Sequence, residues 1–401
     1  QRDYSPWMSA LAGHLSRHYK RWLAGMSVVV VVLTASVGLN RTNDVFNEYF
    51  DETFEVRRVN DFAMSEMTGM HRIDYAVPSG ESGGTMEPEY LQHLDNLMTW
   101  LEQQDEVVYA TSYTNVIKRL NRDLHGGDPA YYRIPDSREL ISQYTLLYEL
   151  SLPQGLGLED QLDIDKRQAR AIVVLKNIGS KPVLDFNDRV EQWMQDNWPA
   201  AMQTKGTGMD ILFGRVTMRN IESMLGGALI ALISVSLLLI FALRSVRYGL
   251  LSLIPNLLPA AMAFGLWGLI NGEIGLAVSV VACMTLGIVV DDAVIVGESI
   301  DQQRRQGGMS GQEAAIAGAQ RVSRPILFAV LTTLFAFAPL LFLPGPEGAL
   351  MRVIPIVSMA ILVLSLVESL WILPSHLSYD RPARGIWRKS EQLSTRINAG
   401  L

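Results

Sequence analysis

Two adjacent aspartates, Asp291 and Asp292, lie in the middle of an otherwise uncharged stretch that runs from Ile274 to Gly297. The stretch is long enough to cross a bilayer as a helix. A charged side chain at the centre of a membrane costs on the order of 3 kcal/mol on insertion scales, so such residues usually face a protein interior or a watery cavity. Carboxylates in this position predict a site that binds protons or other cations.

Adjacent positions on a helix point about 100° apart, so Asp291 and Asp292 cannot share one contact surface. One can face a neighbouring helix while the other faces a water path. Desolvation, together with a second carboxylate nearby, favours the protonated form of one of the two groups at physiological pH. Since protonation removes a charge and permits a different helix packing, the pair predicts a two-state element for alternating access.

Three further polar residues in apolar surroundings are candidates to support the pair. Thr332 and Thr333 could donate hydrogen bonds to the carboxylates, because hydroxyls bridge helices in lipid. Bonds back to the carbonyls of their own helix are an equal alternative. Asn256, between Pro255 and Pro259, is expected to organise a kinked helix, with a relay role as the lesser alternative.

Other polar and small residues in the apolar segments are interpreted as structural. Glu298 and Glu368 each lie near the end of a segment and are expected to be interfacial carboxylates rather than relay members. Four glycines are expected to mark close packing of helices: Gly265, Gly268, Gly275 and Gly287.

The elements that must hold these residues are six apolar segments of roughly 20 residues, the length that spans a hydrocarbon core of about 30 Å. The chain has 401 residues and is 49% hydrophobic, but its apolar residues are concentrated in these segments. The pattern predicts a polytopic α-helical membrane protein with six transmembrane helices. The predicted spans are Trp22 to Leu39, Met224 to Leu243, Gly249 to Ile270, Ile274 to Ser299, Pro325 to Leu343 and Leu350 to Leu373.

The Lys and Arg residues of the short loops indicate orientation, because they favour the cytoplasmic side. They precede the first span, separate the second from the third and the fourth from the fifth, and follow the sixth. Both termini are therefore predicted to be cytoplasmic, with residues 1–21 as an N-terminal segment and 374–401 as an amphipathic tail. The basic start also fits a signal peptide, but the long apolar run and the absence of a clean small-x-small cleavage site favour a retained anchor at 22–39.

The long segment between the first and second spans, residues 40–223, is then extracytoplasmic. Its acidic residues outnumber its basic ones, and a solvated acidic face is favoured over an attraction for cations. The segment reads as two strand, helix, strand units joined by a helical section at Ser137 to Leu150, which predicts an α+β ferredoxin-like domain. The predicted strands are Ile73 to Val77, Val107 to Tyr113, Ala171 to Lys176 and Gly208 to Phe213, and the helices are Pro88 to Gln104 and Pro182 to Trp198. Residues 224–373 then form a five-helix transmembrane domain.

Several kinds of chemistry are not expected. The single cysteine, Cys283, lies inside a predicted span, so there is no disulfide framework. His71, His93 and His125 lack a metal-ligand spacing, and there is no GxxxxGK[ST] phosphate loop. We therefore expect no metal, no nucleotide or other cofactor and no nucleic-acid partner. An intramembrane aspartyl protease also fits poorly, because its two aspartates must converge on one water.

Four segments resemble those of the RND superfamily of exporters. Gly287 to Val294, which reads Gly-Ile-Val-Val-Asp-Asp-Ala-Val, looks like the fourth-helix signature of that superfamily. Ser252 to Ala260 resembles its third-helix Pro-Asn segment, and Pro325 to Thr333 resembles its fifth-helix segment. Leu373 to Leu377 is similar to the close of the sixth helix in efflux permeases. One span, an external α/β domain and five further spans resemble one half of such an exporter.

The resemblance has two parts. From about Arg41 to Met284 the chain is most similar to hydrophobe exporters related to the mycobacterial membrane protein large family, whereas Ala293 to Glu298 looks more like the multidrug-type permeases. In RND exporters the equivalent aspartates relay protons, so the resemblance implies that role for Asp291 and Asp292.

The resemblance implies proton-motive-force-driven export of hydrophobic or amphiphilic molecules, such as a lipid or a drug, across a bacterial inner membrane. It implies a secondary transporter with proton antiport, not an enzyme. The expected partners are membrane lipids, the cargo, a second transporter half from the same or another chain, and a periplasmic adaptor as a further candidate. Two alternatives share the architecture: a sterol-sensing-like lipid-binding membrane module and a proton-driven protein-export accessory.

Overall fold

The computed structural model describes residues 19–45, 50, 52–153, 157–242, 253–307, 309, 311–345, 348 and 351–374. Within its helices the side chains of residues 19–23, 238–242, 253–256, 282–283, 285–293, 301 and 305–307 are outside the description. The chain forms two compact units. Unit 1 comprises Gln1–Thr42 and Asn220–Leu401, and unit 2 comprises Asn43–Arg219. Nearly all of the predicted amphipathic tail at 374–401 lies outside the described residues.

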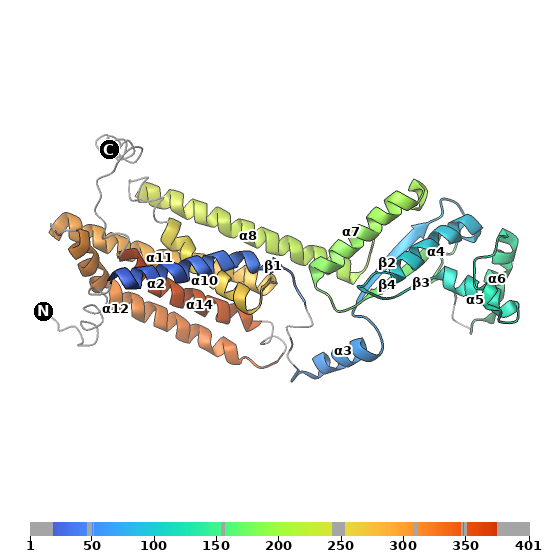
Figure 1. Ribbon diagram of the computed structural model, residues 1–401, viewed down its shortest axis with the longest axis horizontal. Helices are drawn as coiled ribbons and strands as arrows, with labels where there is room; N and C mark the ends of the chain where they lie inside the picture. Colours follow the sequence, from blue (N-terminus) through green and yellow to red (C-terminus); the bar gives the residue numbers. More distant parts are fainter. Residues whose placement is uncertain are drawn as a thin grey trace. The chain divides into compact units, whose positions relative to one another are not determined.

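Unit 2 is built on a three-stranded antiparallel sheet in the order β2-β4-β3 (Figure 1). The strands are β2 (His71–Pro78), β3 (Val107–Ser112) and β4 (Gln168–Leu175). Alternate residues of β2, namely Ile73, Tyr75 and Val77, are fully buried, as the period of two in a strand requires when one face is covered.

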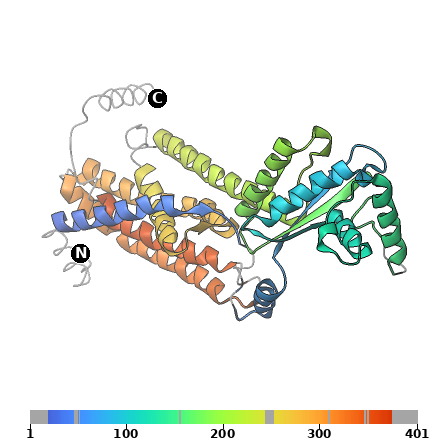
Figure 2. The same cartoon turned by 45° about the vertical axis from the view of Figure 1, so that its right-hand side comes forward.

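Two helices supply the cover for that face. They are α4 (Pro88–Glu102) and α7 (Ser180–Asn197), and Figure 2 shows both beside the strands. Their apolar residues share one core with the buried side of the sheet. On α4 the buried positions are those that the helical spacing predicted: Leu91, Leu94, Leu97, Met98 and Leu101. Each such side chain contributes about 1.5–3 kcal/mol when fully buried, so this core holds unit 2 together.

Further helices complete unit 2. They are α3 (Glu55–Glu66), α5 (Tyr113–Leu124) and α6 (Arg138–Ser151). The prediction of a helical section at 137–150 matches α6, while α3 and α5 were not foreseen. Helix α5 begins at Tyr113 because Ser112 caps it: the Ser112 side chain accepts from the Thr114 backbone N–H, and Asn115 accepts from the Ser112 N–H.

The predicted strand at Gly208 to Phe213 is wrong, because this segment begins the helix α8 (Met209–Ala242). Just before this helix, Thr207 forms an isolated antiparallel bridge with Asp74 of β2. Gly208 then turns the chain with a φ of 130°, and the Asp210 carboxylate in the first helical turn accepts a hydrogen bond from the Arg72 backbone N–H at 2.9 Å. Over the described residues the sheet therefore has three strands, and the four-stranded ferredoxin-like sheet is not formed.

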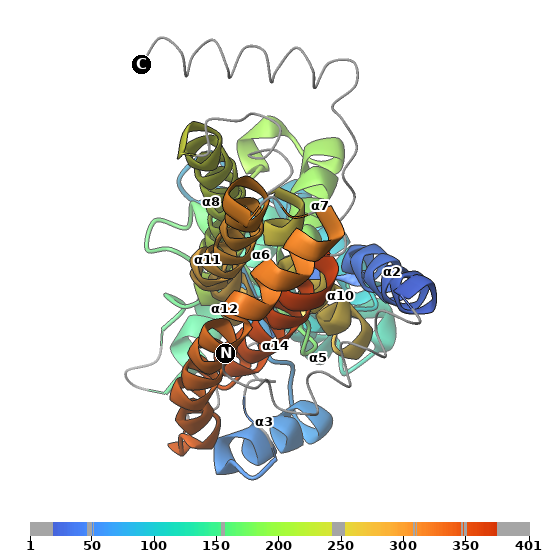
Figure 3. The same cartoon turned by 90° about the vertical axis from the view of Figure 1, so that its left-hand side faces the viewer.

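Unit 1 contains a group of helices that pack side by side. They are α2 (Tyr19–Ala35), continued by η1 (Ser36–Leu39), then α10 (Leu253–Ile270), α11 (Leu276–Gly307), α12 (Gly311–Phe337), continued by η6 (Ala338–Phe342), and α14 (Val353–Val367), continued by the π-helical turn η7 (Glu368–Ile372). Helix α10 contacts both α2 and α14, and α11 contacts both α12 and α14, as Figure 3 shows from the end of the bundle.

In the described part of the chain, three helical segments are long and apolar enough to cross a membrane. They are Met209–Leu237, Gly311–Phe342 and Val353–Ile372. Two shorter apolar helices, Ala24–Leu39 and Leu257–Ile270, overlap the predicted first and third spans. The predicted fourth span falls within α11. The chain is thus a mostly helical membrane protein, and the full count of six spans stays a prediction.

Two glycines let α2 and α10 approach closely, as predicted for them. A Cβ atom at Gly265 would overlap the Leu33 carbonyl oxygen, and one at Gly268 would lie 2.7 Å from the Ser36 carbonyl oxygen. The Asn40 side-chain amide donates to the Phe264 carbonyl at 2.8 Å, which ties the end of the first helix to the same partner. Beyond it, β1 (Arg41–Thr42) pairs in parallel with β5 (Glu273–Ile274).

We expect Gly265→Ala to destabilise the protein, because the new methyl group must push apart two helix backbones. The cost should be about 1–3 kcal/mol, the usual range for overpacking. Gly297→Ala on α11 is the matched control, since a Cβ there would meet nothing within 4 Å. The thermal unfolding midpoint of the purified protein in detergent measures the difference. Equal midpoints for the two variants would contradict the close contact.

Tyr75→Phe should destabilise unit 2 by about 1–3 kcal/mol, the cost of leaving a buried polar atom unpaired. The Tyr75 hydroxyl donates to the Asn187 side-chain oxygen at 3.1 Å, and both residues are fully buried. Tyr109→Phe is the control, because Tyr109 is 45% exposed. Urea unfolding, followed by the fluorescence of the stacked pair Trp100 and Trp193, reports on this unit. An unchanged midpoint for Tyr75→Phe would refute the prediction.

Candidate functional site

The two predicted relay aspartates lie on one long helix of unit 1. Asp291 and Asp292 are in α11, whose backbone is helical without interruption from Leu276 to Gly307. Their side chains are outside the described part of the structure. The helix packs against α10, α12 and α14, so it occupies a central place in the group.

The residues one and two turns after Asp292 are buried, whereas those one and two turns after Asp291 are exposed. Val296, four residues after Asp292, is fully buried, and Ser299, seven residues after it, is 7% exposed. Ile295, four residues after Asp291, is 45% exposed, and Glu298 is exposed as well. Residues three or four positions apart share a helix face, so Val296 with Ser299 and Ile295 with Glu298 mark two different faces of α11, one buried and one exposed in this single chain.

The contact between α11 and α12 is close near the end of α11. The Ser299 hydroxyl donates to the Gly318 carbonyl of α12 at 2.9 Å, and a Cβ atom at Gly318 would lie 2.7 Å from the Ile300 Cα. A larger residue than glycine at this crossing would force α12 away from α11.

The predicted supporting residues lie on α12 and α10. The Thr332 hydroxyl donates to the Phe328 carbonyl at 2.7 Å, and the Thr333 hydroxyl donates to the Ala329 carbonyl at 3.0 Å. Both bonds run back to the same helix, which was the structural alternative for these two residues. Asn256 lies in α10, and its side chain is outside the described part. Support of the aspartates by Thr332, Thr333 or Asn256 stays a prediction.

The sequence predicted that Glu368 is an interfacial carboxylate, but in the structure this residue is buried. It is 2% exposed and starts the π-helical turn η7 at the end of α14. The neighbouring Ser369 hydroxyl lies 3.5 Å from one of its carboxylate oxygens. The signal that could have revealed it is the row of serines on the same helix, Ser358, Ser365 and Ser369, at intervals of seven and four residues.

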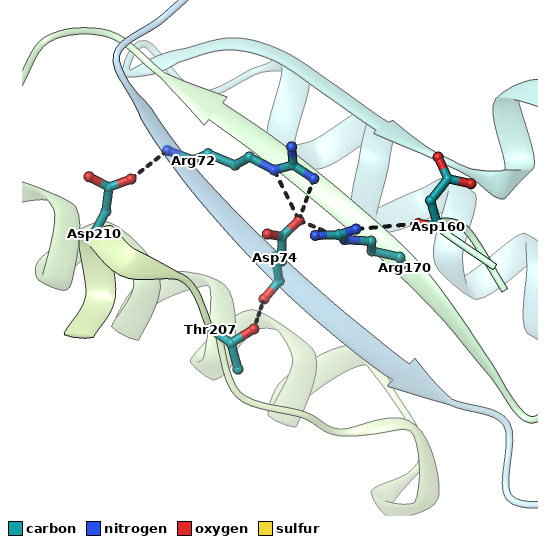
Figure 4. Close-up of polar contacts among 6 residues, drawn as sticks. All are labelled: Arg72, Asp74, Asp160, Arg170, Thr207 and Asp210. Atoms are coloured by element: carbon teal, nitrogen blue, oxygen red, sulfur yellow. Dashed lines mark hydrogen bonds and ion pairs between the residues drawn. The ribbon is translucent and has the colours of Figure 1, made fainter. Parts of the chain in front are cut away.

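A second polar cluster lies on the face of the unit 2 sheet away from α4 and α7 (Figure 4). The Asp74 carboxylate, on β2, pairs with the guanidinium groups of Arg72 at 3.2 Å and Arg170 at 2.9 Å. The Arg72 backbone N–H donates to the Asp210 carboxylate. The Thr207 hydroxyl donates to the Asp74 carbonyl at 3.0 Å. Since Asp74 is matched by these two cations, the cluster ties β4 and the start of α8 to β2 rather than offering a binding site.

A metal site was not expected from the sequence, and the described part of the chain contains no candidate set of ligands. Within these residues no group of three or more His, Cys, Asp or Glu side chains could hold a metal ion.

Comparison with known proteins shows which family the chain is similar to. Residues 161–379 match the family model described as the AcrB/AcrD/AcrF family. The match runs across the aspartate pair and includes α11, α12 and α14. The likeness of Arg41 to Met284 to hydrophobe exporters stays a prediction.

Curated relatives share only part of their length with this chain. The multidrug resistance protein MdtC of Salmonella arizonae is 30% identical over 166 residues, which cover 40% of this chain and 15% of the relative. The proteins of the same name from Escherichia coli O139:H28 and Salmonella paratyphi B are 29% identical over the same length, with the same coverage. The chain therefore matches a small part of the length of these relatives.

The family model covers more than half of the 401 residues, and the resemblance to the RND superfamily is confirmed. The chain belongs to the AcrB/AcrD/AcrF family.

Proposed function

We propose that this chain is one half of a proton-driven exporter of drugs or other hydrophobic and amphiphilic molecules, in the inner membrane of a bacterium. The observation that carries the proposal is the aspartate pair on α11, inside the segment that matches the family model. The name of the MdtC relatives, multidrug resistance protein, supports drugs as one class of cargo. In this proposal the chain is a secondary transporter, not an enzyme, and it exchanges protons for cargo.

The surroundings of α11 support different roles for the two aspartates. Asp292 shares its helix face with the buried Val296 and Ser299, so we assign it to the packed side of α11. Asp291 shares its face with the exposed Ile295, so we assign it to the open side. A proton taken up on the open side would then change the charge of a helix that is packed on its other side, which is the requirement for coupling protonation to helix packing.

The open side of α11 also supports a partner. Met284 and Ile295 are apolar, belong to this side and are 49% and 45% exposed. We propose that a second transporter half, from another copy or a separate chain, covers them and completes the pore. Both termini are then cytoplasmic, six helices cross the membrane, and unit 2 is the extracytoplasmic domain that meets cargo and, where one takes part, a periplasmic adaptor.

Asp291→Asn and Asp292→Asn should each reduce export by roughly 100-fold or to background, as expected when a positioned proton-transfer group is lost. Asparagine has nearly the same shape but cannot carry a proton. The measurement is the efflux of a fluorescent amphiphilic dye from bacteria whose dye export depends on this chain. Glu313→Gln is the control, because Glu313 is an exposed carboxylate at the start of the neighbouring helix α12.

Membrane fractions should contain all three variants in equal amounts, so that a loss of efflux reports on transport and not on insertion. Efflux at the wild-type rate in both asparagine variants would exclude the aspartates as proton carriers. A loss of efflux in Glu313→Gln as large as in the other two would show that the effect is not specific to the pair.

A further inference from the structure

Besides the aspartate pair, unit 1 contains another acidic residue in an apolar helix, and its carboxylate is buried. Glu368 is 2% exposed, and no ion pair to its carboxylate occurs among the described residues. The only hydrogen bond found for it there is the 3.5 Å contact with the adjacent Ser369 hydroxyl. A buried carboxylate without a cation is costly in its charged form, so it is stable only with a proton or another cation bound.

The backbone at this position departs from a regular helix. The α-helix α14 ends at Val367, and Glu368–Ile372 form a π-helical turn. Such turns insert one extra residue, are rare, and are frequently found at functional sites. Glu368 is therefore placed at the one point of this span where the helical ladder changes.

A row of hydroxyl groups leads along the same helix to Glu368. Ser358 and Ser365 are fully buried, and neither side-chain oxygen has a hydrogen-bond partner among the described residues. An unpaired buried hydroxyl costs about 1–3 kcal/mol, so such groups are normally satisfied by water or a ligand. Ser365 is seven residues after Ser358 and three before Glu368, so the three lie along one side of the helix.

Glu368 and the aspartate pair belong to neighbouring elements, because α11 contacts both α14 and η7. Val281 of α11 belongs to one buried cluster with Val357 of α14, and Val296 of α11 belongs to another with Leu373, just after η7. Asp292 is eleven residues after Val281, and Glu368 is eleven residues after Val357. At about 1.5 Å per residue, each of the two acidic residues lies about 16 Å along its own helix from its helix's member of the first cluster.

We propose that Glu368 is a third proton-binding carboxylate of the membrane unit, which binds and releases a proton beside the aspartate pair. Its place in a relay rests on the proposed function, but its binding of a proton does not. The neighbouring elements α10 and α14 contain no ionisable residue in their sequences. The ionisable residues of α11 and α12, which also pack around this end of α14, are Cys283, Asp291, Asp292, Glu298, Asp301, Arg304, Arg305, Glu313, Arg321 and Arg324.

Infrared difference spectroscopy of the full chain, reconstituted in lipid, tests the proposal through the C=O stretch of protonated carboxyl groups. We expect a band that disappears as the pH is raised past neutrality, and that shifts when glutamate, but not aspartate, carries a ¹³C-labelled carboxyl group. This labelling uses the wild-type chain and does not depend on the folding of any variant. Glu368→Gln should abolish the band, and Glu298→Gln, at an exposed carboxylate, should leave it unchanged.

The double variant Asp291→Asn with Asp292→Asn separates this proposal from the proposed function. The glutamate band should persist in that variant, whether or not export is lost. The absence of a titrating glutamate band, or its persistence in Glu368→Gln, would overturn the proposal. Titrations in sodium and in choline chloride should have the same midpoint; a midpoint that falls as sodium is added would instead identify a sodium ion as the ligand.

Discussion

A carboxylate inside a helix bundle must be shielded from lipid and must lose or share its charge, and this requirement governs unit 1. Three such groups, Asp291, Asp292 and Glu368, lie on helices that pack against each other. Among the described residues, close contacts at Gly265, Gly268 and Gly318 and two buried apolar clusters hold these helices together. Val281 and Val357 belong to one of these buried clusters, and Val296 and Leu373 belong to the other. Along its own helix, the buried Glu368 lies between the cluster members Val357 and Leu373.

In unit 2, the partly buried carboxylate of Asp74 is paired with arginines. The core of this unit is apolar on the side that α4 and α7 cover. On the other face, Asp74 is only 18% exposed, and two arginines balance it. A paired carboxylate in unit 2 stabilises a sheet, whereas the carboxylate of Glu368 in unit 1 is buried without an ion pair among the described residues.

The sequence predicted the features that depend on local patterns. The apolar spacing of Leu91, Leu94 and Leu97 located α4, and Gly265 marked a close crossing of helices before any partner was known. It failed at Gly208 to Phe213, because three consecutive apolar residues fit a strand and a helix equally well, and contacts from Arg72 and His71 to Asp210 decide the outcome. The burial of Glu368 could not be predicted from its place near the end of a span, since the π-helical turn and the neighbouring helices determine it.

The crossing of α2 with α10 has a consequence for the order of events during synthesis. Asn40 at the end of the first helix bonds to Phe264, which is 224 residues later in the chain. At roughly 5–20 residues per second, the ribosome needs about ten to forty seconds to make that partner. In the proposed six-span arrangement, α2 therefore stays in the bilayer without this partner until then. The run of valines from Val28 to Val32 suits this arrangement, because most of these side chains stay exposed even in the folded chain and do not depend on α10 for their burial.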